Sequence, residues 1–250
     1  MRPKNLAEIE SMRIGGKMLA TVLDILSQRV APGVSTQELD DIATKEIKSL
    51  GGRPSFLNHE GFPKAICTSI NDEIVHGLPS PKRIIKKGDV IGIDCGIIYR
   101  NLIVDAAITV YTGENPPGDV KRLLEGTKKA LDAGIAALRG DGTRVGDISN
   151  AVQSVLDREK LGIIRDLVGH GVGDAVHESP NIPNYGVAGT GPVLHAGMTV
   201  AIEPMASLGD WRVTTAKDGW AVVMQDGSVG AHFEHTVLIT DDSAEILTSL

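Results

Sequence analysis

The stretch VIGIDCGIIYRNLIVDAAITVY, residues 90–111, is rich in valine and isoleucine along nearly its whole length. Such composition is typical of buried strands, and the stretch predicts a β-hairpin. Each predicted arm contains one aspartate, Asp94 and Asp105, separated by 11 positions. This spacing is consistent with the two arms of one hairpin, which would let the two carboxylates converge.

The flanking sequence repeats one order of elements. The capping box Ser35-x-x-Glu38 opens a helix, and Gly15-Gly16 marks a weak point within an earlier one. Each half, about 5–111 and 117–240, has helix, helix and strands, although the halves share no residue-level identity. We expect an α+β domain over residues 1–250, with helices packed on a central antiparallel sheet. Helices are predicted over about 5–30, 35–50, 117–138 and 145–160, and strands over 65–70, 90–111, 163–168, 199–205, 220–224 and 231–240.

Composition narrows the class of protein. The chain has 250 residues, 42% of them hydrophobic, and a net charge of −7, which argues against a nucleic-acid-binding surface as its main purpose. Its most apolar N-terminal window, residues 18–26, contains Asp24 and is too short for a membrane helix or signal peptide. The chain has only two cysteines, Cys67 and Cys95, which argues against a disulfide framework, so we expect a cytoplasmic protein.

Four carboxylates lie inside apolar segments that are predicted to be strands. A buried carboxylate is unfavourable unless a cation compensates it, and a pair of divalent metal ions is the natural compensation. One aspartate alone is more often a turn or salt-bridge residue, but four together favour a metal site. The candidate carboxylate ligands are Asp94, Asp105, Glu203 and Glu234.

Histidines supply the other candidate ligands. His170 lies in the glycine-rich segment Gly169-His-Gly-Val-Gly173, where a backbone approaches closely. His76 and His177 carry a weaker local signal, and the remaining histidines carry none. The chain lacks the HExxH motif of zinc proteases, the GxSxG motif of serine hydrolases and the CxxC motif of redox proteins. The histidines without a local signal are His59, His195, His232 and His235.

Taken together, these motifs resemble the type I methionine aminopeptidase family almost from the first helix to the C-terminus. The resemblance implies the pita-bread fold, with two related halves around a dinuclear metal centre. The matching segments are Ser69-Ile-Asn-Asp-Glu-Ile-Val-His76-Gly, Ile93-Asp94, Val104-Asp105, Gly169-His-Gly-Val-Gly173, Ile202-Glu-Pro-Met205, Lys217-Asp-Gly-Trp220 and Phe233-Glu-His-Thr236.

The resemblance also implies a role for each matched residue. Asp94 resembles a chelating ligand of one metal, His170 and Glu203 resemble ligands of the other, and Asp105 and Glu234 resemble bridging carboxylates. His76 and His177 match two non-ligand histidines that contact the substrate. Two positions depart from the family, because His59 replaces a tyrosine and Val176 is smaller than the phenylalanine often found there. The expected methionine pocket comprises Phe56, His59, Phe62, Cys67, Val176 and Trp220.

The expected activity is removal of the initiator methionine from nascent polypeptides, with preference for a small second residue. Glu203 is expected to act as the base, assisted by His76 and His177. Co, Mn, Fe or Zn would suit the two sites. We expect a monomer that needs neither nucleic acid nor membrane, and a contact with the ribosome is left open. The alternatives are a proline-directed aminopeptidase or prolidase on the same fold, and a non-catalytic binding protein.

Overall fold

The computed structural model describes residues 1–250, and its centre is an antiparallel sheet of nine strands. The predicted hairpin of residues 90–111 is confirmed: β4 and β5 pair along their whole length around a turn at Arg100-Asn101. The strand order is β1-β4-β5-β14-β9-β7-β8. The central strands are β4 (Val90–Tyr99), β5 (Leu102–Tyr111), β14 (Glu234–Ile239) and β9 (Thr199–Ile202), and the outer strands are β1 (Arg53–Pro54), β7 (Gly169–Gly171) and β8 (Glu178–Ile182). Two further strands join the sheet, because β2 (Ile66–Ile70) pairs with β4 and β15 (Ala244–Ile246) pairs with β14.

Four α-helices form at the predicted places. The Ser35–Glu38 capping box is confirmed, because the Ser35 side chain accepts from the Glu38 N–H while Glu38 accepts from the Ser35 N–H. The first helix runs without a break through the predicted weak point at Gly15-Gly16. The helix continues there because the glycines allow close packing: a Cβ at Gly16 would lie 2.1 Å from the Leu247 carbonyl oxygen. The helices are α1 (Leu6–Arg29), α2 (Thr36–Ser49), α3 (Gly118–Ala136) and α4 (Val145–Arg158), and a short 3-10 helix, η1, spans His59–Gly61.

Several predicted strands are shorter than expected. The segment 199–205 breaks after Ile202, because Pro204 has no N–H to donate to a neighbouring strand. The segment 231–240 breaks at Phe233, whose N–H instead donates to the Pro204 carbonyl at 3.4 Å. The strand predicted over 163–168 is largely wrong, because only Gly162–Ile163 pairs, with β10.

The remaining strands form two small sheets of three strands each. The strand predicted over 220–224 forms only at its end. The first sheet combines β13 (Gly230–His232), β10 (Met205–Ser207) and β6 (Gly162–Ile163), and the second combines β11 (Val213–Thr215), β12 (Val222–Met224) and β3 (Glu73–Val75).

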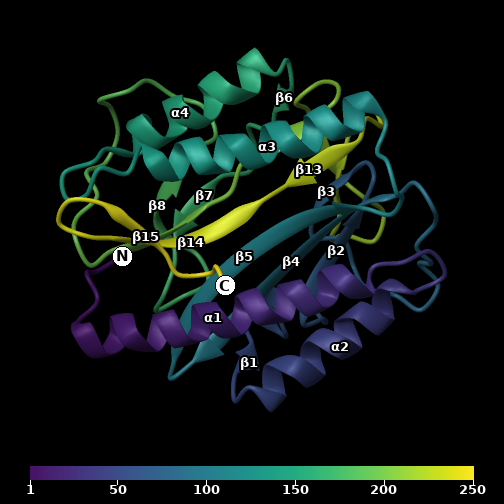
Figure 1. Cartoon of the computed structure of the whole chain (residues 1–250), viewed down its shortest axis with the longest axis horizontal. Helices are drawn as coiled ribbons and strands as arrows, with labels where there is room; N and C mark the ends of the chain where they lie inside the picture. The colour runs from purple at the N-terminus through teal and green to yellow at the C-terminus, as the bar shows by residue number, and fades with distance from the viewer.

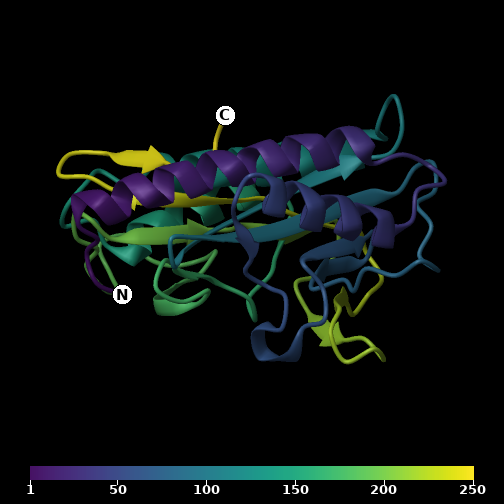
Figure 2. The ribbon, with the colours of Figure 1, turned by 90° about the horizontal axis from the view of Figure 1, so that it is seen from below.

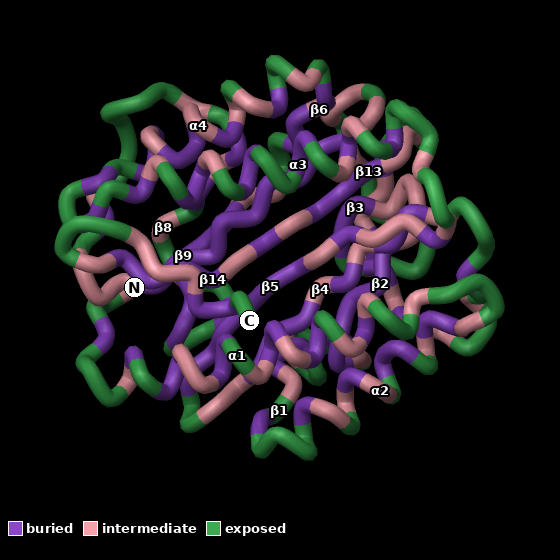
Figure 3. The backbone as a smooth tube through the Cα atoms, in the orientation of Figure 1, coloured by how far each residue is buried: buried purple, intermediate pink, exposed green.

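The helices and the loops lie on opposite sides of the sheet. Figure 1 views the sheet through α1 and α3, and Figure 2 shows α1 on one side and the loop with η1 on the other. One hydrophobic core packs α1 and α2 against β4 and β5, and a second packs α3 and α4 against β9 and β14. The central strands are therefore buried along most of their length, as Figure 3 shows. None of the helices is long and apolar enough to cross a membrane.

Candidate metal centre and substrate cavity

Sheet register places the predicted metal ligands on one face of the sheet. Ala107 of β5 pairs with Asp94 on one side and with Glu234 on the other. Directly paired residues point to the same face, and so do residues two apart along a strand, such as Asp105 and Ala107. The same rule places His170 of β7 on the same face as Ala201 of β9, because these two residues are directly paired. Ala201 lies two positions before Glu203.

These side chains meet in a compact group, here called the carboxylate–histidine cluster, which is Asp94, Asp105, His170, Glu203 and Glu234. Ligand atoms of Asp105, His170 and Glu234 all lie within 4.8 Å of one another. Glu203 joins them through its Oε1, which is 3.2 Å from His170 Nε2. Asp94 lines the same cavity as the others. The structure therefore brings every predicted ligand to one place.

Neighbouring main-chain and side-chain groups orient the cluster. The Asp105 N–H donates to Thr236 Oγ1 at 2.8 Å, and that hydroxyl donates to the Asp105 carbonyl at 2.7 Å. His170 Nδ1 lies 3.0 Å from the Gly171 carbonyl oxygen. A carbonyl only accepts, so Nδ1 carries the proton and Nε2 faces the cluster, which is the usual arrangement of a metal-binding histidine.

Burial and crowding shift the pKa values of the cluster. Burial raises the pKa of Asp105 well above its ordinary value, and the nearby Asp94 charge raises it further. Burial likewise raises the pKa of Glu234, with the Asp105 charge adding to the effect. Burial alone would lower the pKa of His170, but its hydrogen bond and charge interaction with Glu203 raise it to about 9. The cluster thus retains protons near neutral pH when no cation is present.

His232 is a part of this site that the sequence did not indicate. Its Nε2 is buried, has no hydrogen-bond partner, and lies 3.4 Å from Glu203 Oε2. His232 belongs to β13, where it pairs with Met205 of β10. Met205 directly follows the strand break at Glu203-Pro204, so this pairing brings His232 close to Glu203. This pairing joins segments that are distant in the sequence. Its only local signal is its position two residues before Glu234.

The cluster opens into a cavity of about 320 Å³, a size typical of small-ligand sites. One wall is an apolar group that includes Phe56, Phe62 and Val176. Phe62 and Trp220 meet edge to face, with ring centroids 5.2 Å apart. Trp220 is held by a turn in which its N–H donates to Asp218 Oδ1 at 2.8 Å. All the residues expected in the methionine pocket line this cavity: Phe56, His59, Phe62, Cys67, Val176 and Trp220.

Both predicted non-ligand histidines also line the cavity. His177 stacks edge to face on His170, with ring centroids 4.5 Å apart, and the His59 ring centroid lies 5.6 Å from that of His177. Burial, together with the positive charge of His170, lowers the pKa of His177 to about 4. Burial also lowers the pKa of His76, which occupies a left-handed backbone conformation with φ 59°. Both rings are therefore neutral at pH 7.

The cavity has two further acidic residues that the sequence did not indicate, Glu60 and Asp166. Glu60 belongs to η1 and has a positive φ of 48°. Asp166 follows the short strand β6, in the segment that was predicted to be a longer strand. The remaining histidines without a local signal, His195 and His235, do not line the cavity.

We expect metal binding to this cluster to release protons and to weaken as pH falls. With a pKa of about 9, His170 is protonated at pH 7, and the raised pKa values of Asp105 and Glu234 favour their protonated forms, so a cation must displace protons. Affinity should therefore increase with pH up to about 9, the pKa of His170. Calorimetric titration of metal-free protein with Mn²⁺, in buffers of different ionisation enthalpy, measures the protons released. A count of zero at pH 6.5 would contradict the pKa shifts.

Comparison with known proteins places this geometry in a family. Residues 10–241 match the model of metallopeptidase family M24. The methionine aminopeptidase of Clostridium acetobutylicum is 44% identical over 247 residues, which cover 98% of this chain and 97% of the relative. The crystal structure of methionine aminopeptidase from Thermotoga maritima aligns with a TM-score of 0.97 at 43% identity and covers 100% of both chains.

A more distant structure shows the fold alone. The Xaa-Pro dipeptidase of Bacillus anthracis aligns with a TM-score of 0.78 at 20% identity, and the match covers 99% of this chain but 62% of the dipeptidase. The pita-bread architecture expected from the sequence, with its helices packed on an antiparallel sheet, is confirmed by the close structural match to the Thermotoga protein.

Proposed function

Because this chain belongs to metallopeptidase family M24 and, within it, to the methionine aminopeptidases, we propose that it removes the initiator methionine from newly made proteins. The observation that carries this proposal is the placement of the ligand atoms. Those of Asp105, His170 and Glu234 lie within 4.8 Å of one another. They border the same cavity as the apolar wall that contains Phe62.

The cluster fits a pair of divalent cations. Asp94 Oδ1, Asp105 Oδ1 and Glu234 Oε1 are buried oxygens without a hydrogen-bond partner, as expected for atoms whose partner is a metal ion. Four carboxylates together carry a charge of −4 when ionised, which two divalent ions would balance. We propose that Asp94 would hold one ion, that His170 and Glu203 would hold the other, and that Asp105 and Glu234 would contribute ligands to both. Mn, Fe, Co and Zn suit this donor set.

The protein side chains then perform distinct tasks. When bound, the metal pair supplies a water nucleophile that is active near neutral pH. Glu203 accepts the proton of this water and transfers it to the leaving amine. Neutral His177 donates a hydrogen bond to the developing oxyanion, and neutral His76 contacts the scissile amide nitrogen. We propose that the free α-amine of the substrate would lie on the Asp94 side of the cluster, which would restrict cleavage to N-termini.

The apolar wall of the cavity selects the first residue. Phe56, Phe62 and Val176 are buried, and half-buried Trp220 closes on Phe62, so an unbranched thioether side chain would be desolvated there. His59 adds a polar ring on the side toward His177. We propose that these residues form the methionine pocket. The preference for a small second residue is an expectation from the family.

Peptide hydrolysis tests this proposal directly. We expect the purified protein to release methionine from Met-Gly-Met, to lose that activity with a chelator, and to regain it with Mn²⁺ or Co²⁺. Metal analysis should give two ions per chain, and Asp105→Asn serves as the control for a contaminating peptidase. Preferential cleavage of an Xaa-Pro dipeptide would favour the prolidase alternative. Metal binding without cleavage of either peptide would favour a non-catalytic role.

We also propose that the chain works as one catalytic domain, since the cluster draws residues from both halves. Asp94 and Asp105 come from the first half, and His170, Glu203 and Glu234 from the second. A cytoplasmic monomer acting on nascent N-termini fits this assignment, because Cys67 in the cavity is a free thiol that a reducing compartment would preserve. Size-exclusion chromatography with light scattering tests the monomer.

A further inference from the structure

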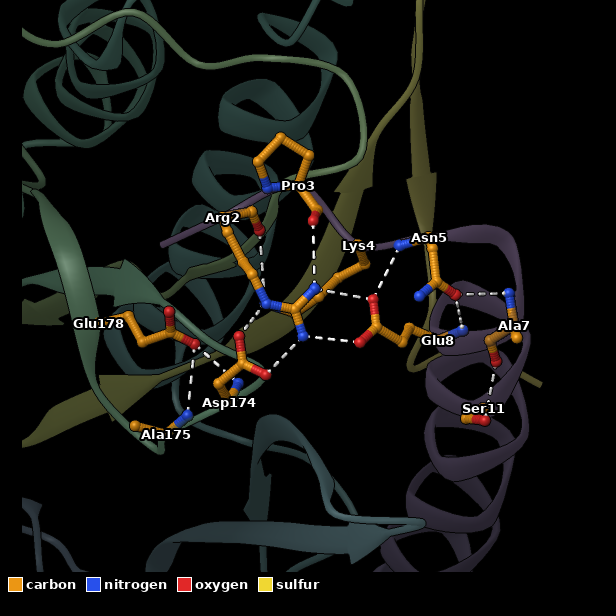
Figure 4. Close-up of polar contacts among 10 residues, drawn as sticks. All are labelled: Arg2, Pro3, Lys4, Asn5, Ala7, Glu8, Ser11, Asp174, Ala175 and Glu178. Atoms are coloured by element: carbon orange, nitrogen blue, oxygen red, sulfur yellow. Dashed lines mark hydrogen bonds and ion pairs between the residues drawn. The ribbon is translucent and has the colours of Figure 1, made fainter.

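The first residues of the chain lie against the loop that carries His177 (Figure 4). Residues 1–4 are here called the N-terminal arm, and residues 173–178 the His177 loop. The arm is fixed to the body of the protein by its main chain, because the Lys4 N–H donates to the Gly197 carbonyl at 2.7 Å. From there, two cationic side chains reach the same carboxylate of the loop. The arm and the loop are more than 160 residues apart in the sequence.

Asp174 receives both cations. Lys4 Nζ lies 2.9 Å from Asp174 Oδ2, and Arg2 Nη2 lies 3.0 Å from Asp174 Oδ1. Arg2 also pairs with Glu8 at 2.6 Å, in the first turn of α1, so it links the loop to the start of that helix. The hydrogen bond and charge of Lys4 lower the pKa of Asp174, which keeps the carboxylate ionised. Both oxygens of this side chain are thus held from the arm.

Lys4 is the anchor of this contact. Its side chain is 0% exposed, and Asp174 is its one ion-pair partner. A buried ammonium is unfavourable unless it is paired and hydrogen-bonded, so the two side chains depend on each other. The loop is also shaped to admit Lys4: Gly173 has φ 144°, and a Cβ there would lie 2.6 Å from Lys4 Cε. The contact is therefore built into both segments.

The His177 loop connects Asp174 to the His177 ring in the cavity. The Gly173 carbonyl accepts from the Ile103 N–H at 2.8 Å at one end. At the other end, the Asp174 N–H donates to Glu178 Oε1 at 2.8 Å. His177 lies within the segment that these two hydrogen bonds hold, and its side chain makes no hydrogen bond. The loop backbone and the contact with His170 therefore position its ring. A displacement of Asp174 would move the residues that follow it.

We propose that Lys4 and Arg2 are positioning residues, which hold Asp174 so that the His177 loop presents the His177 ring to the carboxylate–histidine cluster. This inference rests on the proposed function, in which His177 contacts the developing oxyanion. It links the site to a segment, residues 1–4, that does not line the cavity. Displacements of about 1 Å in a catalytic group can reduce turnover about 100-fold, so the tie is expected to matter for rate.

Kinetics of matched variants test the proposal. Lys4→Met keeps most of the side-chain volume and removes the charge, and Asp174→Asn removes its partner. We expect kcat to fall about 10-fold in each, with KM for Met-Gly-Met within about 2-fold and metal content unchanged. Arg13→Met is the control, because Arg13 pairs with Glu245 at 2.7 Å and neither residue lines the cavity. Unchanged kcat in Lys4→Met would overturn the proposal.

A double-mutant cycle separates positioning from general stability. In the His177→Ala background, Lys4→Met should cause almost no further loss of kcat, because the group it positions is gone. An equal loss in both backgrounds would overturn the proposal.

Hydrogen exchange of the peptide that covers the His177 loop tests the same link without catalysis. Exchange there should be faster in Lys4→Met than in Arg13→Met, and equal rates would overturn the proposal. If the unsubstituted protein releases no methionine, the proposed function fails, whereas hydrogen exchange still decides whether the arm holds the loop.

Discussion

Replacing Asp105 with asparagine should abolish metal-dependent peptidase activity while leaving the protein folded. Asp105 is buried at the centre of the cluster, and its Oδ1 has no hydrogen-bond partner within the chain. Asparagine keeps the shape but removes one of the four negative charges and one ligand oxygen. A metal ion contributes several kcal/mol to such reactions, so kcat/KM should fall by about 10³-fold or more.

The same substitution should not destabilise the metal-free protein. The pKa of Asp105 is raised in the fold, so the unfolded chain ionises first as pH rises, and stability is lost from about pH 4 upward. Asparagine removes this loss. The main-chain hydrogen bonds of Asp105 with Thr236 do not involve the carboxylate and should persist. We therefore expect the metal-free variant to melt at pH 7 at or above the temperature of the metal-free parent.

Two measurements check this prediction, namely the metal content after dialysis and the melting temperature in the presence of chelator. Asp132→Asn on α3 is the matched control, since Asp132 pairs only with Lys128 on the helix surface at 3.4 Å. It should keep full metal content and full activity. An Asp105→Asn protein with near-normal, metal-dependent turnover would rule out the bridging role.

Local signals in the sequence predicted the parts of the fold that depend on neighbouring residues. The hairpin 90–111 and the Ser35–Glu38 capping box are of this kind, since strand composition and helix capping act over a few positions. The unfavourable placement of carboxylates in apolar strands was also informative, because burial makes a lone charge costly wherever it occurs. It pointed to Asp94, Asp105 and Glu234 without any knowledge of strand order.

Long-range contacts decided the features that the sequence did not indicate. Gly15-Gly16 lowers helix propensity, but the close approach of Leu247 to Gly16 explains why tertiary packing overrides that tendency. His232 reaches Glu203 only because β13 pairs with β10 beyond the break at Pro204. The ion pair between Lys4 and Asp174 forms because the N-terminal arm packs against a loop that lies 170 positions later in the sequence. None of these contacts leaves a pattern within one window of sequence.

Removing the His177 ring should lower turnover with little effect on metal binding. His177 lies outside the group whose ligand atoms converge, although its ring stacks on His170 with centroids 4.5 Å apart. Burial is the main cause of its lowered pKa, about 4 in the metal-free protein, so the ring is a neutral hydrogen-bond donor at pH 7. Loss of one donor to an oxyanion costs about 10²- to 10³-fold in kcat, and His177→Ala should fall in that range.

The distribution of this loss between kcat and KM identifies the role of His177. A donor that acts on the developing oxyanion should lower kcat and kcat/KM together and leave KM nearly unchanged. His195→Ala is the matched control, because His195 is exposed and pairs with Asp141 at 3.1 Å away from the cavity. If His177→Ala instead loses its metal along with its activity, His177 is a ligand. The assignment of metal binding to the carboxylate–histidine cluster, and of substrate contact to the neutral histidines, would then be wrong. The imidazole stacked on His170 would belong to the metal centre itself.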